Sequence, residues 1–205
     1  LMNAYRFGEL SNIYPIARGL SPLLLSIITL IIGQDVLTTG QMVGIMTISL
    51  SMIYMGFLQF RFNQDGPKGL ILACITGIFI ASYSMVDALG ARLTGDAMVF
   101  YSSSTILNVT LMGIYSMTFH RDVVKSLISN GKKPFFVGGT ASYLAYVMVL
   151  WACLQAPVAI VSSLRETSVI FAMFLGVFLL GERISRTKII VTFVMITGVI
   201  ITRLF

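Results

Sequence analysis

Long apolar runs with few charges, separated by short polar or charged turns, dominate the chain. A helix needs roughly 20 predominantly apolar residues to cross the hydrocarbon of a bilayer, whereas barrel strands would alternate over about ten residues. Seven runs meet or approach the helical length: residues 11–33, 41–60, 69–90, 97–119, 135–155, 157–181 and 189–203. The pattern therefore predicts an all-α integral membrane protein with about seven transmembrane helices.

The segments between the runs indicate where the chain meets water. Residues 63–67 (NQDGP) and 129–134 (SNGKKP) combine turn-forming residues with charge, which hydrocarbon does not tolerate. Residues 1–8 resemble the end of an earlier helix. From these breaks we predict a first region at residues 1–60, a linker at 61–68 and a second region at 69–205.

Composition narrows the classes of function. Hydrophobic residues make up 57% of the chain and charged residues 11%, too few charges to cover a soluble domain. The net charge of +6 comes from dispersed basic residues, so we expect no nucleic-acid partner. Two cysteines inside apolar runs and a single histidine predict no disulfide, metal site or cofactor. No catalytic motif is present, and we expect no enzyme.

Two stretches of the chain are similar to each other. Residues 14–22 (YPIARGLSP) parallel residues 161–168 (VSSLRETS), and each stretch opens a run that closes with a glycine, Gly33 or Gly181. Arg18 and Arg165 match at an offset of 147, and the glycines match at an offset of 148. The copies lie an odd number of helices apart, so they should cross the membrane in opposite directions. This predicts an inverted repeat.

Three charges fall deep inside the paired helices. At a rise of about 1.5 Å per residue, Arg18 and Arg165 lie roughly 6 Å from the midpoints of their helices, and Glu166 about 4.5 Å. A charge there costs on the order of 2.5 to 3.5 kcal/mol, so these side chains should face the bundle interior or a wet cavity. In one interpretation Glu166 neutralises an arginine and ties two helices together. In the other, the arginines recognise an anionic substrate group, and Glu166 exchanges protons or cations.

Other polar side chains lie inside the predicted spans. We expect Tyr14, Ser163 and Asn108 to line a substrate pathway, although Asn108 suits an interhelical hydrogen bond equally well. Asp87 lies near the end of its span and could pair with Arg92. Small residues four apart, such as Gly77 and Ala81, should allow close helix contacts.

One part of the chain carries a resemblance to a known family: residues 156–166 (APVAIVSSLRE), followed by Gly176 and by residues 179–183 (LLGER). They resemble the fourth helix of the second repeat in the EamA type of the drug/metabolite transporter superfamily, and residues 14–22 resemble its counterpart in the first repeat. The resemblance implies ten helices in two inverted five-helix repeats, with about two and a half of them before Leu1. One departure is that residues 33–35 (GQD) stand where the second copy has 181–183 (GER).

The resemblance implies a secondary transporter, an exporter of a small polar or amphipathic metabolite by alternating access, in the inner membrane of a bacterium. Arg18 and Arg165 would then bind substrate charge, and Glu166 would serve ion coupling or neutralisation. We also expect the lipid bilayer, a coupling proton or ion, and a second copy of the chain as partners. Two alternatives are a flippase of a lipid-linked sugar and a non-transporting membrane interaction subunit, in which the three charges should be fully paired and sealed.

Overall fold

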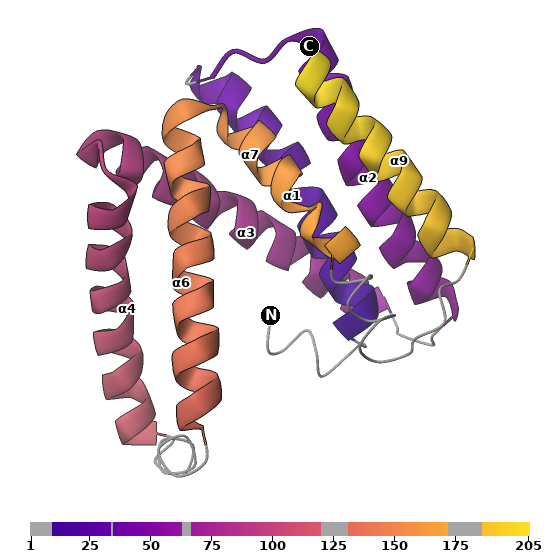
Figure 1. Cartoon of the computed structure of the whole chain (residues 1–205). Helices are drawn as coiled ribbons and strands as arrows, with labels where there is room; N and C mark the ends of the chain where they lie inside the picture. The colour runs from indigo at the N-terminus through magenta and orange to yellow at the C-terminus, as the bar shows by residue number, and fades with distance from the viewer. Residues whose placement is uncertain (1–9, 34, 63–66, 120–130, 172–185) are drawn as a thin grey trace. The chain divides into compact units, whose positions relative to one another are not determined.

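The computed structural model describes residues 10–33, 35–62, 67–119, 131–171 and 186–205 (Figure 1). Five helices in these ranges are long and apolar enough to cross a membrane, and the described residues contain no strand. The prediction of an all-α membrane protein is confirmed. The helices are α1 (Leu10–Ile32), α2 (Thr39–Phe62), α3 (Pro67–Thr94), α4 (Ala97–Phe119), α6 (Lys132–Gln155), α7 (Val158–Arg165) and α9 (Arg186–Leu204).

Local sequence sets several helix ends. At the start of α2, the Gln41 N–H donates to Thr38 Oγ1 at 3.2 Å, and the Thr38 N–H donates to Gln41 Oε1 at 3.0 Å. This reciprocal pair satisfies donors that a helix start leaves free. At the start of α4, Asp96 Oδ1 accepts the N–H of Met98 at 2.7 Å. Gly95 adopts a φ of 70°, which ends α3 and lets α4 begin at once.

The chain forms two compact units. The first comprises residues 1–86 and 156–205, and so contains α1, α2, most of α3, α7 and α9. The second comprises residues 87–155, with the end of α3, α4 and α6. The first unit contains parts of both predicted regions, 1–60 and 69–205, whereas the second lies within 69–205. The boundary between the regions stays a prediction.

In the first unit, α2 and α9 run antiparallel in close contact (Figure 1). Thr38 precedes α2 and Phe205 follows α9, and the Thr38 hydroxyl donates to the Phe205 carbonyl at 3.0 Å. Further along, a Cβ on Gly44 would collide with Thr202 Oγ1 and lie 2.9 Å from the Gly198 carbonyl oxygen. The two backbones therefore approach as closely as small residues permit.

Helix α1 contacts both α2 and α3. A Cβ on Gly19 would lie 2.8 Å from the Cβ of Met52 on α2. A Cβ on Gly77 of α3 would lie 2.9 Å from the Ala17 carbonyl oxygen of α1, and Ala81 is fully buried. The expected close helix contact at Gly77 is confirmed.

In the second unit, α4 and α6 lie side by side and antiparallel (Figure 1). Ala97 at the start of α4 packs with Leu150 near the end of α6, in a cluster that also contains Ala91 of α3. The ring of Phe100 lies directly against Gly90 of α3. These small residues join the end of α3 to the α4–α6 pair.

Candidate functional site

Arg18 lies in the first half of α1, between two buried prolines, Pro15 and Pro22. Proline has no N–H, so Pro22 cannot donate to the carbonyl of Arg18, which stands four residues before it. The helix nevertheless continues to Ile32. A backbone acceptor without its normal helical donor therefore lies on the same turn as the Arg18 side chain.

Helix α7 breaks where the sequence predicted a continuous span over residues 157–181. It ends at Arg165, and Glu166 and Thr167 form a turn before a short helical stretch at residues 168–171. In this turn the Glu166 N–H donates to the Ser163 carbonyl at 3.1 Å, one residue nearer than in an α-helix. The Thr167 hydroxyl donates to the Leu164 carbonyl at 2.7 Å and so competes with the regular backbone pattern.

The break releases the backbone carbonyl of Arg165. In a regular α-helix this oxygen would accept the Val169 N–H, but Val169 donates to the Glu166 carbonyl at 3.1 Å instead. Arg18 Nη2 takes this place and donates to the Arg165 carbonyl at 3.4 Å. The irregular turn of α7 thus presents a backbone acceptor to the guanidinium on α1.

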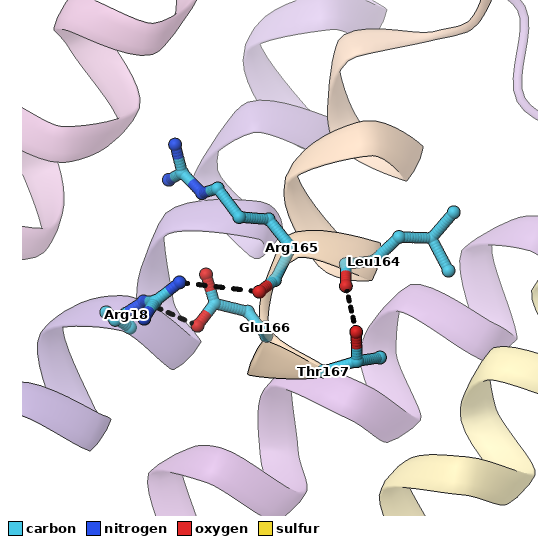
Figure 2. Close-up of polar contacts among 5 residues, drawn as sticks. All are labelled: Arg18, Leu164, Arg165, Glu166 and Thr167. Atoms are coloured by element: carbon cyan, nitrogen blue, oxygen red, sulfur yellow. Dashed lines mark hydrogen bonds and ion pairs between the residues drawn. The ribbon is translucent and has the colours of Figure 1, made fainter. Parts of the chain in front are cut away.

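Arg18 and Glu166 form an ion pair between α1 and α7 (Figure 2). Arg18 Nε lies 2.8 Å from Glu166 Oε2, and the Arg18 side chain is 13% exposed whereas that of Glu166 is 0% exposed. The second carboxylate oxygen, Oε1, is buried and has no hydrogen-bond partner among the described residues. A buried carboxylate held at one oxygen only is incompletely compensated.

Arg165 takes no part in this ion pair through its side chain. Figure 2 shows its guanidinium extending away from the Glu166 carboxylate, while its backbone carbonyl faces Arg18. Its Nε atom is buried, and it too has no hydrogen-bond partner in the described part of the chain. The structure therefore brings all three predicted charges together, but only two of them are paired with each other.

A second contact ties α1 to α7 at their other ends. Asp35 Oδ2, just beyond α1, accepts the N–H of Val158 at the start of α7 at 3.0 Å. The start of α7 therefore lies beside the end of α1, and the end of α7 lies beside Arg18. The two helices run antiparallel, as the inverted repeat predicted, and the arginines matched by the offset of 147 are in contact.

The other predicted site residues stand apart from this contact. Ser163 is fully buried, and its hydroxyl donates to the Ile160 carbonyl of its own helix at 2.8 Å. Asn108 lies on α4 in the second unit, with its side chain exposed. Tyr14 belongs to α1, but its side chain lies outside the described residues. The role of these three residues stays a prediction.

Sequence reasoning missed the polar partners of the second unit. Asp87, expected beside Arg92, accepts a hydrogen bond from the Tyr146 hydroxyl at 2.7 Å. Arg92 Nε donates to the Cys153 carbonyl at 2.9 Å. Both contacts join α3 to α6, and only the spacing of aromatic and charged residues on separate helices could have indicated them.

A cavity of about 400 Å³ lies at one end of the second unit. It is lined by apolar side chains such as Trp151 and Met148, together with Asp96 and Gln155. None of the three charged site residues contributes to it. Within the described ranges, no group of three His, Cys, Asp or Glu side chains is arranged to hold a metal ion.

Comparison with known proteins identifies a family. The model of the EamA-like transporter family matches residues 67–204, more than half of the chain, including Arg165 and Glu166. No curated protein and no solved structure matches the chain.

Proposed function

The chain belongs to the EamA-like transporter family, and from this premise we propose that it moves a small polar or amphipathic metabolite by alternating access between its two inverted halves. Family membership together with the apolar helices makes it an integral membrane transporter of the drug/metabolite type. We further propose export as the direction and the inner membrane of a bacterium as the location.

The buried contact between Arg18 and Glu166 is the observation that carries this proposal. It joins two antiparallel helices of the repeat at an ion-pair distance of 2.8 Å, and the Glu166 side chain is 0% exposed. Discontinuous helices with free carbonyls at mid-membrane are a recurring way to build substrate and ion sites in transporters. A charged contact at such a break can exchange partners as the two halves move.

The residues divide into charge-bearing and lining groups. Arg18 and Arg165 provide the positive charge that a substrate would meet, and Glu166 neutralises one of them or exchanges the coupling proton or ion. Tyr14, Ser163 and Asn108 are proposed as polar lining. A homodimer belongs to the same proposal, with a second copy of the chain as partner.

A non-transporting subunit would need its buried charges fully paired. Glu166 Oε1 and Arg165 Nε, both buried and both without a hydrogen-bond partner among the described residues, count against that interpretation. The alternative function, a flippase of a lipid-linked sugar, is tested in the same experiment. The sugar head group of such a substrate would pass the same charged contact.

The test starts with thermal unfolding of the purified protein against amino acids, nucleotide sugars and lipid-linked sugars, since a ligand that prefers the folded state raises its apparent stability. A compound that stabilises the protein is then assayed for uptake into proteoliposomes. We expect Glu166→Gln and Arg165→Gln to abolish flux while folding and membrane insertion are retained.

The matched control is Arg203→Gln, because Arg203 is an exposed arginine at the end of α9. This variant should keep the flux of the unmodified protein. Unchanged flux in the Glu166 and Arg165 variants would contradict the assignment of the site.

A further inference from the structure

The three site charges do not balance. Arg18 and Glu166 neutralise each other at 2.8 Å, which leaves the guanidinium of Arg165, among the described residues, as an excess positive charge beside the break in α7. A charge in an apolar bundle requires a partner or a ligand. The question is therefore what the Arg165 side chain binds.

Arg165 cannot easily share the carboxylate of its neighbour in sequence. Successive residues of a helix point about 100° apart, so the side chains of adjacent positions do not face each other. Figure 2 agrees, because the Arg165 side chain extends away from the Glu166 carboxylate. Its buried Nε donor has no acceptor among the described residues.

Two nitrogen atoms of the Arg18 guanidinium, in contrast, already contact the protein. Its Nε contacts Glu166 Oε2, and its Nη2 donates to the carbonyl of Arg165 at 3.4 Å. Arg18 thereby holds the backbone from which the Arg165 side chain projects. Arg18 is thus a positioning residue, and Arg165 has the donors that remain available.

We propose that, of the two site arginines, Arg165 makes the direct contact with the substrate while Arg18 positions it, and that Arg165 binds an oxyanion of the carboxylate or phosphate type. A guanidinium offers parallel N–H donors in a fixed plane, which match the two oxygens of such a group. One anionic group would balance the excess charge of the site. This inference rests on the proposed transport function and adds the substrate class to it.

The first experiment uses phenylglyoxal, which reacts with accessible guanidinium groups, on the purified unmodified protein, with mass spectrometry of each arginine. We expect Arg165 to react faster than Arg18. Benzoate and phenyl phosphate should slow the reaction of Arg165 severalfold, whereas benzylamine and benzyl alcohol, which share the ring but not the negative charge, should not. Arg203 serves as an internal control whose rate none of the four probes changes.

The two anions distinguish the two chemical sources. Protection by benzoate alone assigns a carboxylate, and protection by phenyl phosphate alone assigns a phosphate. Faster reaction of Arg18, protection by neither anion, or equal protection by all four probes would overturn the proposal.

The second experiment measures thermal stabilisation by the same probes. The anion that protects the unmodified protein should raise its Tm, fail to raise that of Arg165→Gln, and retain part of its effect on Arg165→Lys, which keeps the charge but not the planar fork. Arg203→Gln should respond like the unmodified protein. An equal rise in the Tm of a folded Arg165→Gln variant would contradict the inference. If this variant does not fold, the phenylglyoxal reaction rates of the unmodified protein are the test.

Failure of this inference can be separated from failure of the transport function. Anion protection of Arg165 without flux of any compound in proteoliposomes would refute transport and leave the binding site standing. Flux without anion protection would refute the binding site and leave transport standing.

Discussion

The two compact units treat buried polar groups in different ways. In the first, a carboxylate and a guanidinium from α1 and α7 meet in an apolar interior, and Glu166 is 0% exposed. In the second, Asp87 and Arg92 are only half-buried, and each has a neutral partner, the Tyr146 hydroxyl and the Cys153 carbonyl. The first arrangement is costly and suits a role in function, whereas the second joins helices at modest cost.

Aromatic packing reinforces this contrast in the second unit. The ring of Tyr101 packs against those of Tyr143 and Tyr146, with ring centroids 5.2 and 4.8 Å apart. The hydroxyls of Ser102 and Tyr143 are hydrogen-bonded at 2.5 Å. Polar and aromatic side chains of α4 and α6 thus contact each other through ring packing and a hydrogen bond.

Backbone packing differs as well. In the first unit a Cβ on Gly44 would meet α9 directly, whereas Cβ atoms on Gly113 and Gly138 of the second unit would meet nothing within 4 Å. Only 6% of the span in α4 and 11% of that in α6 is buried inside the structure, against 44% of the span in α1. The first unit is therefore the one in which helix positions are fixed by contact.

The largest expected effect comes from breaking the ion pair. Arg18→Gln leaves Glu166 buried without its charged partner, and we expect a loss of about 3–5 kcal/mol in the free energy of unfolding. Denaturant titration in mixed micelles measures this loss.

The double variant Arg18→Gln with Glu166→Gln is the matched control, because it removes both charges and should recover most of the stability. If the single variant is as stable as the unmodified protein, the ion pair is not buried as described, and the contrast between the units collapses.

A smaller effect is expected from crowding the α2–α9 contact. Gly44→Ala places a methyl group on Thr202 Oγ1 and near the α9 backbone, so we expect a loss of about 1–3 kcal/mol in unfolding free energy. Gly138→Ala in α6 is the control, and its open surroundings should tolerate the methyl group without loss. Equal effects of the two substitutions would show that the units are packed alike.

The smallest effect should follow from removing one hydroxyl in the second unit. Tyr146→Phe deletes the donor to Asp87 but keeps the ring packed on Tyr101, so we expect a loss of about 0.5–1.5 kcal/mol. Transport in proteoliposomes should be unchanged. A loss of flux comparable to that of Glu166→Gln would move the functional site into the second unit.

Hydropathy and the repeat were sufficient to predict much of the first unit. The apolar runs predicted the helices, and the repeat predicted the antiparallel direction of α1 and α7. Their contact through Glu166 was one of two interpretations that the sequence left open. The break at Glu166 and Thr167 escaped prediction, because a run of apolar residues looks the same whether or not its hydrogen-bond pattern is interrupted.

Side-chain partners were harder to predict than helices. Which arginine pairs with Glu166 depends on the directions in which successive side chains leave the helix. The offset of the repeat gives no information about these directions. The partner of Asp87 lies 59 residues away on another helix, so it depends on how α3 and α6 are rotated against each other. Whether Tyr14 and Asn108 line a pathway depends in the same way on the faces that their helices present.

The separation of Arg18 and Glu166 along the chain has a consequence for biosynthesis. Ribosomes must add 148 residues after Arg18 before its carboxylate partner exists. At about 5–20 residues per second, this takes on the order of ten seconds or longer. During that interval Glu166 is absent, so the ion pair that joins α1 to α7 cannot form until α7 has been made.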